Sequence, residues 1–405
     1  MTGHADRVAG GTGSPRAAIA GVYEYPHRLS RGLSKYQIKA ECAARALADA
    51  GLSWSDVDAV YDPGDFGMFP GLQAPEYFGI NPRVVDTTSV GGCAFEFHAA
   101  SAARDIAAGR ASVALLTYGA TPKTDARAIG TGPRPATEAS GSGNMERPYG
   151  NTLVGGYALA ARRHMYEYGT TAEQLAEIAV VSRYHATRNP VALAGLAELG
   201  ISHTGELTVA DVVGSRLIAD PLHLLDCCLV SDGGGAVVIV SAEVARDLPS
   251  RPVWILGAGT AVGYMTNTRD ITTSAASESG PLAFGQAGVR PAEIDVAMIY
   301  DAFTITVLTF LEDLGFAKKG EGGEYVAGGR LRYDRPGGPA LNTDGGGLPS
   351  CHPGMRGIFL LIEATRQLRG QAAVQVPGAR LAVAHGTGGN LGSRHAGGTI
   401  ILGAN

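Results

Sequence analysis

The sequence predicts a layered α/β fold built from two similar halves. Apolar strands alternate with amphipathic helices along the chain, a helix–turn–strand pattern occurs twice in the same order, and one long segment has no counterpart. Alternation of strands and helices is typical of sheets that are covered by helices. The 405 residues are enough for two or three core-forming units.

Each predicted element follows from its hydrophobic pattern. Helices are expected where apolar residues recur with a period near 3.6, and strands where short apolar runs stand between turn signals. In the first half the strands are expected at 17–19, 57–61, 84–88, 113–118 and 236–240, and the helices at 36–50 and 95–108. In the second half a helix is expected at 358–369 and a strand at 381–384.

The repeated pattern indicates an internal duplication. Residues 50–62 and 287–301 each end a helix on glycine, cross a polar turn and enter a strand that finishes with Tyr-Asp. The segments 91–118 and 345–384 form a second pair, each with glycines, a helix and a strand. Two matches in the same order predict halves at 1–250 and 251–405.

A long insertion is predicted in the first half, at about 120–221, because nothing in the second half matches it. It begins with a polar stretch rich in glycine and proline at 124–150, followed by helical patterns at 155–168 and 172–186. Insertions of this length usually carry binding function. Duplicated halves tend to form a site where their corresponding loops meet, and those loops carry Cys93, Tyr300, His352 and His385.

Composition excludes several classes of protein. The formal charge is −5 and no basic stripe is present, so a nucleic-acid surface is not expected. No apolar run approaches the ~18 residues of a membrane span, and the first residues lack the apolar segment of a secretory signal, so we expect a cytoplasmic protein. The five cysteines lack Cys-x-x-Cys spacing, which predicts neither a disulfide framework nor a metal site. Cys42, Cys227 and Cys228 are expected to be buried packing residues.

A candidate catalytic histidine lies in the segment 350–354, after the glycine run 345–347 and before the predicted helix at 358–369. The glycines allow backbone to approach a ligand closely, and Pro353 stiffens the turn. The helix N-terminus favours negative charge. His352 is therefore placed like an acid/base imidazole, and the alternative is a half-buried histidine in an ordinary strand-to-helix turn.

Several segments resemble the thiolase superfamily, and more narrowly its sterol-carrier-protein-x and lipid-transfer-protein branch. They are Leu224–Cys228 with Ser231–Gly234, Tyr300–Phe303, Gly346–Leu348 through His352-Pro353, and Glu363–Gly370. The resemblance covers Ala17 to Gly403. It implies two βαβαβαββ halves packed as five α/β/α/β/α layers, with a loop domain inserted in the first half.

The catalytic motifs of thiolases match this chain only in part. His352-Pro353 matches the Gly-His-Pro motif, with Cys351 in place of the glycine. Tyr300 begins a match to Asn-Glu-Ala-Phe, with tyrosine in the asparagine position. His385, at the start of His-Gly-Thr-Gly, stands where the resemblance places the late Cys-x-Gly cysteine.

The position of the thiolase nucleophile falls on either Gly92 or Cys93. We favour Gly92, because the helix and strand that follow then need only one inserted residue. With Cys93 as nucleophile, the resemblance implies thiolytic acyl transfer on a 3-ketoacyl-CoA. With Gly92 in the slot, Tyr300, His352 and His385 remain for retro-aldol cleavage of a 3-hydroxyacyl-CoA. Some lipid-transfer-protein relatives are steroid side-chain aldolases that use two tyrosines, of which Tyr300 matches one, while the second position falls at Cys351.

The resemblance therefore predicts an enzyme that acts on the α,β carbon–carbon bond of an acyl-CoA, with retro-aldol cleavage of a lipid or steroid side chain narrowly favoured. A non-catalytic scaffold subunit is the further alternative. We expect no bound cofactor or metal, with coenzyme A as part of the substrate, and the resemblance implies a homodimer and a small OB-fold/zinc-ribbon partner. The expected catalytic residues are His352, Tyr300, His385 and Cys93, and the expected substrate-binding residues are Gly92, Asp301, Phe303, Cys351, Gly346 and Gly388.

Overall fold

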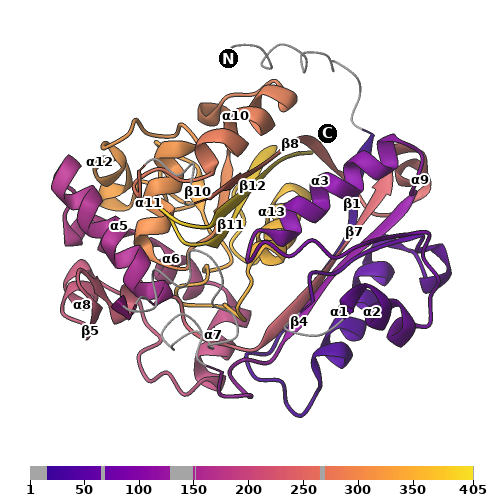
Figure 1. Cartoon of the computed structure of the whole chain (residues 1–405), viewed down its shortest axis with the longest axis horizontal. Helices are drawn as coiled ribbons and strands as arrows, with labels where there is room; N and C mark the ends of the chain where they lie inside the picture. Colours follow the sequence, from indigo (N-terminus) through magenta and orange to yellow (C-terminus); the bar gives the residue numbers. More distant parts are fainter. Residues whose placement is uncertain (1–15, 65–68, 128–148, 151, 265–269, 405) are drawn as a thin grey trace.

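The computed structural model describes residues 16–64, 69–127, 149–150, 152–264 and 270–404 (Figure 1). Most of the polar stretch predicted at 124–150 therefore lies outside the described residues. All of the strands and helices expected from the sequence fall inside them.

Ten strands form one sheet whose order is symmetric about its centre. The order is β10-β9-β11-β12-β8-β1-β7-β4-β2-β3, so each strand of the first half has a counterpart at the same distance from the middle. The central strands β1 and β8 join through Ala18–Trp254 and Ile19–Val253. The strands are β1 (Ala17–Glu24), β2 (Ala59–Tyr61), β3 (Val84–Asp86), β4 (Val113–Ala120), β7 (Gly233–Ser241), β8 (Val253–Gly263), β9 (Val296–Ile299), β10 (Ala340–Leu341), β11 (Leu381–Gly389) and β12 (His395–Gly403).

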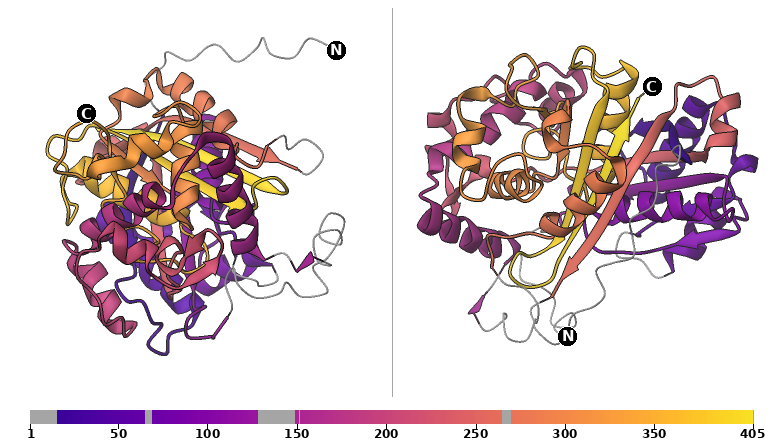
Figure 2. Two further views of the ribbon diagram at one scale, coloured as in Figure 1. Left: turned by 90° about the vertical axis from the view of Figure 1, so that its left-hand side faces the viewer. Right: turned by 90° about the horizontal axis from the view of Figure 1, so that it is seen from above.

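Four helices and the two halves of this sheet make up the predicted five layers: α1 (Lys35–Ala50) outside, the strands of the first half, α3 (Ala94–Ala107) and α13 (Gly357–Arg369) between the halves, the strands of the second half, and α10 (Ala276–Ala287) outside. Helix α1 covers β1, β4 and β7 on the outside, and α10 covers β8 and β12. Helices α3 and α13 contact each other and strands of both halves, so they form the middle layer (Figures 1 and 2). The five-layer arrangement is confirmed.

The repeated sequence pattern has a common local cause. Helix α1 ends at Gly51 and α10 ends at Gly288, with φ of 76° and 68°. Glycine adopts this left-handed conformation without the steric cost of a Cβ. A short 3-10 turn follows each glycine, at 54–56 and 291–293, and leads into β2 or β9.

The two halves differ most between their last two strands. Only residues 390–394 join β11 to β12, whereas residues 121–232 join β4 to β7. This longer connection contains α5 (Leu153–Tyr168), α6 (Ala172–Ala186), α7 (Pro190–Glu198), α8 (Val209–Val213) and the hairpin of β5 (Leu217–Ala219) and β6 (Leu222–His223). Helices α5 and α6 pack against α11 (Thr304–Asp313). The exact limits of the two halves and of the insertion stay a prediction.

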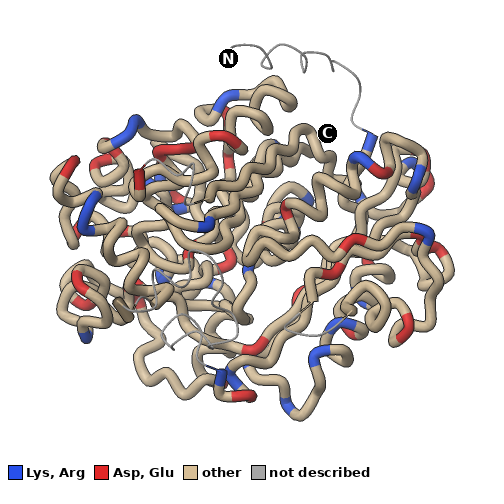
Figure 3. Tube along the Cα trace, in the orientation of Figure 1, with Lys and Arg blue, Asp and Glu red and all other residues tan. Residues whose placement is uncertain are grey.

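The remaining helices are peripheral: α2 (Pro70–Phe78), α9 (Ala242–Asp247) and α12 (Gly322–Val326). Charged residues of both signs are scattered over the outside of the trace (Figure 3). Within the described ranges, no helix combines the length and apolar character that crossing a membrane requires.

The five cysteines are free thiols. Cys42 is fully buried, as predicted. Cys227 and Cys228 were expected in the core as well, but both are partly exposed and line a pocket. The reason is that they follow the insertion and run beside residues 302–303, where Cys228 N–H donates to the Ala302 carbonyl at 2.9 Å and Cys227 forms a β-bridge with Phe303.

Candidate active site

The loops at the N-termini of α3 and α13 meet beside the end of β9. Gly92 and Cys93 precede α3, Tyr300 follows β9, and His352 lies in the loop that leads into α13. A backbone hydrogen bond of 3.0 Å from Gly357 N–H to the Gly92 carbonyl ties the two helix starts together. Residues from both halves therefore converge on one point of the middle layer.

A pocket with a volume of about 920 Å³ opens at this point. Backbone of several glycines forms one wall, and apolar side chains, many of them from the insertion, form another. The glycines are Gly91, Gly92, Gly354, Gly388 and Gly389, and the apolar residues include Leu153, Val154, Leu199, Ile201, Ile218, Leu229, Val230 and Phe303. Of the expected site residues, this pocket exposes Tyr300, His352, Gly92, Phe303 and Gly388.

Tyr300 stands where the side chain of residue 92 would be. A Cβ built on Gly92 would lie 2.3 Å from the Tyr300 hydroxyl oxygen and 2.4 Å from Cζ. Real Cβ atoms do not approach other atoms this closely, so the phenol and a side chain at 92 exclude each other. If Gly92 is at the position of the thiolase nucleophile, a cysteine there would have no room for its thiol, because the Tyr300 phenol fills that space.

The Tyr300 hydroxyl is held at the start of α13. It accepts a hydrogen bond of 3.2 Å from Arg356 N–H and donates a long one of 3.5 Å to the Gly354 carbonyl. Burial raises the pKa of Tyr300 well above the ordinary value of a phenol, and the Cys228 thiol acts in the same direction. The residue therefore keeps its proton at neutral pH and can offer it to a ligand.

His352 faces the pocket as a neutral imidazole. Neither ring nitrogen forms a hydrogen bond to another described residue, and the ring lies edge-on to Tyr300 with centroids 5.5 Å apart. Burial lowers the pKa of His352 to about 3, and the positive charge of Arg356 adds to this effect. The unprotonated nitrogen of the neutral ring is open to a hydrogen bond from a ligand.

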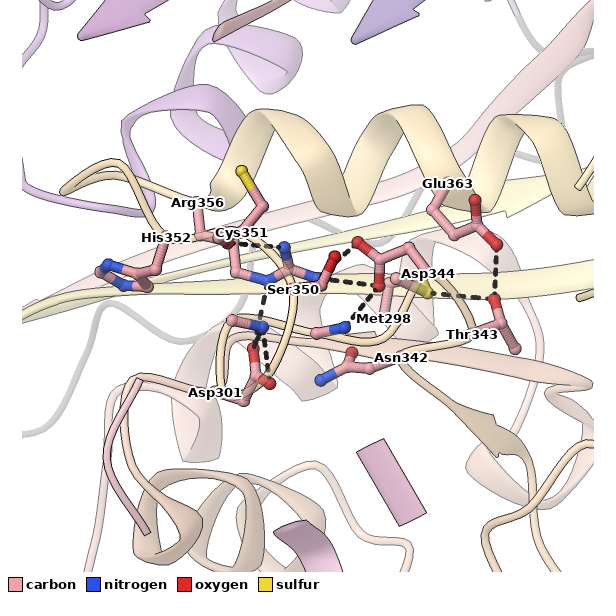
Figure 4. A network of polar contacts seen from close by, with 12 residues as sticks. Met298, Asp301, Asn342, Thr343, Asp344, Ser350, Cys351, His352, Arg356 and Glu363 are labelled. Atoms are coloured by element: carbon pink, nitrogen blue, oxygen red, sulfur yellow. Dashed lines mark hydrogen bonds and ion pairs between the residues drawn. The ribbon is translucent and has the colours of Figure 1, made fainter. Parts of the chain in front are cut away.

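A buried ion-pair network holds the loop that carries His352 (Figure 4). The Arg356 guanidinium contacts Asp301 at 3.1 Å and Asp344 at 2.6 Å, and it donates to the Cys351 carbonyl at 3.1 Å. Asp301 also accepts hydrogen bonds from Gly347 N–H and Leu348 N–H. Because Asp301 follows Tyr300 directly, the network fixes both pocket residues relative to α13.

Three of the expected binding residues belong to this support and not to the pocket wall. Asp301 is fully buried, and burial raises its pKa to about 6 although Arg356 opposes the shift. A Cβ on Gly346 would lie 2.2 Å from an Asp301 carboxylate oxygen, so the glycine makes room for that carboxylate. The Cys351 sulfur accepts a hydrogen bond of 3.7 Å from the Ser231 hydroxyl, inside the protein.

Cys93 lies next to the pocket without lining it. It is the N-cap of α3, it is fully buried, and its thiol points to the Val90 carbonyl at 3.6 Å. Burial raises the pKa of Cys93 well above the usual value of a thiol, and Glu96 acts in the same direction. Both effects oppose the thiolate that a nucleophile requires.

His385 faces the other side of β11. Its ring packs 4.8 Å from the Phe310 ring centroid, and Nδ1 is 2.9 Å from the Thr399 hydroxyl. Successive residues of a strand point to opposite faces, so Gly386 and Gly388 face the α3 side. A Cβ on Gly386 would lie 2.9 Å from the Cys93 Cα. Gly388, which lines the pocket, and Gly386, which faces the start of α3, therefore lie on the face of β11 opposite His385.

The pocket also contains polar residues that sequence reasoning did not assign to the site. Tyr157 of α5 donates a hydrogen bond of 3.0 Å to the Gly389 carbonyl, and its ring lies 4.9 Å from Phe303. Lys123, Arg127 and Arg216 add positive charge to the lining. These residues belong to the unpaired insertion, so no repeat in the sequence could indicate them.

Comparisons with known proteins agree with this architecture. A family model described as "Thiolase C-terminal domain-like" matches residues 257–404. The chain is 34% identical to an acetyl-CoA acetyltransferase of Methanothermobacter thermautotrophicus over 87% of this chain and 91% of that protein. It is 36% identical to a steroid side-chain-cleaving aldolase of Thermomonospora curvata over 92% of this chain and 95% of that protein.

A solved structure described as "Ltp2-ChsH2(DUF35) aldolase" is also similar, with a TM-score of 0.82 and 33% identity over 96% of this chain and 98% of that one. The chain belongs to the thiolase superfamily and is an enzyme of that superfamily. Within it, the chain falls in the sterol-carrier and lipid-transfer branch, which includes steroid side-chain aldolases.

Proposed function

We propose that this enzyme breaks the α,β carbon–carbon bond of a 3-hydroxyacyl-CoA by a retro-aldol reaction. The observation that carries the proposal is the Tyr300 phenol, which occupies the space that a nucleophilic side chain at residue 92 would need. The thiol of Cys93, the alternative nucleophile, points to the Val90 carbonyl, and burial and Glu96 both oppose its thiolate form. The similar steroid side-chain-cleaving aldolase and the similar aldolase structure support the same reaction.

The site groups suit the two ends of the reaction. The neutral His352 imidazole accepts the proton of the β-hydroxyl group, the bond between the α- and β-carbons breaks, and its electron pair moves into the thioester as an enolate. The β-carbon becomes a carbonyl carbon and leaves as a ketone or aldehyde. The Tyr300 hydroxyl donates a hydrogen bond to the enolate oxygen, where negative charge develops.

The rest of the pocket fits an acyl-CoA with a bulky apolar acyl group. Lys123, Arg127 and Arg216 supply positive charge for the phosphates of coenzyme A. The apolar wall from the insertion suits a lipid or steroid side chain, whose transfer from water is favourable. We assign no metal and no separate cofactor to the reaction.

Matched substrates distinguish the reactions. We expect CoA-independent cleavage of a 3-hydroxyacyl-CoA by the wild type and by Cys93→Ala, and loss of activity by a factor of about 10²–10⁴ in His352→Ala. CoA-dependent cleavage of the matched 3-ketoacyl-CoA that disappears in Cys93→Ala would establish thiolysis instead. Unchanged turnover in His352→Ala would refute both mechanisms.

We further propose a homodimer and a small OB-fold/zinc-ribbon partner, and the description of the similar aldolase structure, which names a DUF35 component, supports a partner. Analytical ultracentrifugation of the purified chain tests the homodimer, and a monomer at micromolar concentration would contradict it.

Coexpression with a DUF35 protein tests the partner. If the chain alone turns over substrate at the same rate as the mixture, a partner is not required.

A further inference from the structure

A buried carboxyl group next to the Gly92 turn of the pocket has no evident structural partner. Glu96, in the first turn of α3, is fully buried, and neither of its carboxyl oxygens forms a hydrogen bond to another described residue. An unsatisfied polar group in the interior costs about 1–3 kcal/mol, and an unpaired charge costs more. An apolar residue at this position would avoid that cost.

Three glycines from three elements make the space that Glu96 fills. A Cβ on Gly386 would lie 2.2 Å from Glu96 Oε2, one on Gly357 would lie 2.4 Å from the same oxygen, and one on Gly398 would lie 2.6 Å from Glu96 Cβ. Gly386 and Gly398 are directly opposite each other on β11 and β12, and Gly357 begins α13. The carboxyl group thus has a dedicated cradle in the middle layer.

The cradle borders the same turn as Tyr300. The Gly92 carbonyl oxygen lies beside the Glu96 carboxyl group, because a Cβ on Gly357 would be 2.5 Å from one and 2.4 Å from the other. Glu96 occupies the volume of a side chain at 386, on the face of β11 that continues to the pocket at Gly388. The Tyr300 phenol and the Glu96 carboxyl group therefore fill the volumes that side chains at residues 92 and 386 would occupy.

The surroundings allow the carboxyl group both to hold and to release a proton. Burial raises the pKa of Glu96 to about 8, so it is largely protonated at neutral pH. The titratable neighbour on α3 is the Cys93 thiol, and the facing residues of α13, β11 and β12 are glycines. The N-termini of α3 and α13 both approach the group, and helix N-termini stabilise an anion.

We propose that Glu96 is the acid that protonates the α-carbon of the enolate after the carbon–carbon bond has broken. This inference rests on the proposed retro-aldol function. The carboxyl O–H bond breaks, the electron pair of the enolate forms the new C–H bond, and Glu96 is left as a carboxylate. The proton that His352 took from the β-hydroxyl group balances the one that Glu96 gives up, so each turnover moves one proton from oxygen to carbon.

The reverse of this step is exchange of the α-protons of a simple thioester with solvent. Propionyl-CoA is incubated with the enzyme in deuterium oxide, and incorporation of deuterium at the α-carbon is followed by mass spectrometry. We expect exchange by the wild type and a rate lower by a factor of about 10²–10⁴ in Glu96→Gln, with propionyl-CoA affinity unchanged. Glu243→Gln, at an exposed glutamate in the first turn of α9, is the matched control and keeps the wild-type rate.

A folding defect is separated by a second variant. Glu96→Asp keeps a carboxyl group but withdraws it by one methylene, so we expect exchange between that of the wild type and that of Glu96→Gln at an unchanged thermal midpoint. Exchange at the wild-type rate in Glu96→Gln, while the wild type cleaves 3-hydroxyacyl-CoA, overturns the role of Glu96 alone. A wild type that neither cleaves nor exchanges overturns the proposed function as well.

Discussion

At the scale of single residues, the site depends on two glycines, because side chains from other elements fill the volume beside each of them. The volume next to Gly92 holds the phenol of Tyr300, and the volume next to Gly386 holds the carboxyl group of Glu96. Glycine in a strand or before a helix weakens local structure. In exchange for that loss of local stability, the two glycines let the Tyr300 phenol and the Glu96 carboxyl group enter the middle layer.

The hydroxyl group of Tyr300 is expected to matter for chemistry and its ring for packing. Tyr300→Phe keeps the ring beside Gly92 and removes the hydrogen-bond donor. We predict that kcat for 3-hydroxyacyl-CoA cleavage falls by a factor of about 10²–10³, as for loss of an oxyanion-stabilising donor. The thermal midpoint is expected to stay within a few degrees, and a kcat above half of the wild-type value would contradict the assignment.

The steric exclusion between residues 92 and 300 is testable without a substrate. Gly92→Ala places a Cβ against the phenol ring, and overpacking of this kind costs about 1–3 kcal/mol in the free energy of unfolding. In Tyr300→Ala the ring is gone, so the added methyl group at 92 is expected to cost little in the double variant. Urea denaturation of the four proteins gives the coupling energy, and additive effects would show that the two residues do not share space.

At the scale of elements, the start of α13 organises the pocket. Its N-cap residue Arg356 donates its backbone N–H to Tyr300 and pairs its side chain with Asp301 and Asp344. Burial alone would lower the pKa of Arg356, but the two carboxylates raise it, so the guanidinium stays charged. One residue therefore links the end of β9, the loop of His352 and the helix.

Breaking this network is expected to be costly because it leaves charges buried. Arg356→Met removes the cation between two buried carboxylates, and loss of one partner of a buried ion pair costs about 3–5 kcal/mol. We predict a loss of this size in urea denaturation. Arg83→Ala, at a largely exposed ion pair with Asp58, is the control and should leave the midpoint unchanged. A loss no larger than that of the control would show that Arg356 does not hold the loop.

The sequence could predict where helices and strands lie better than it could predict which side of a strand each side chain faces. Periodicity located α1, α3, α6 and α13 almost to the residue, since amphipathic helices between glycines leave a strong pattern. The strand expected at 381–384 is the start of β11, which continues to Gly389. Because the pattern breaks off in the glycine-rich segment, it could not show that His385 faces α11 while Gly386 faces α3.

The pocket wall was harder to predict for a related reason. The internal repeat indicates site residues by comparison of the two halves. The insertion, which contributes Tyr157 and much of the apolar lining, has no counterpart in the second half and so could not be compared. Glu96 gave no signal either, since a glutamate in the first turn of a helix is common at a surface. Its burial depends on glycines at residues 357, 386 and 398, which come together only in the folded chain.

At the scale of the whole molecule, the candidate site exists only when the two halves are packed together. The first half supplies Gly92 and Glu96, and the second supplies Tyr300 and His352. The symmetric sheet brings the N-termini of α3 and α13 to the same place, so both helix ends favour the negative charge of an enolate. Neither half alone contains both His352 and Glu96.

The middle layer and its surroundings also bury several histidines, whose contribution to stability depends on pH. Burial lowers the pKa of His98, His185 and His395 to about 4, and that of His352 and His385 to about 3. In the unfolded chain these groups titrate near 6.5. Below that pH these histidines bind more protons in the unfolded state than in the folded state, so their contribution to the free energy of unfolding falls as the pH falls from about 6.5 towards 4.

Glu96 and Asp301 oppose this trend, because the folded state binds protons more tightly at both and therefore gains stability as the pH falls towards the ordinary range of carboxyl groups. Glu363, Asp226 and Asp313 act in the same direction, because burial raises their pKa values too. The contribution of one histidine is therefore measured by substituting it.

His98 offers a test away from the pocket, since it packs 5.8 Å from Tyr61 and 6.2 Å from Phe95. His98→Phe removes one titrating group, so its urea midpoint should fall less than that of the wild type between pH values of about 7 and 5. An equal fall in both proteins would mean that His98 already takes up a proton in the folded state.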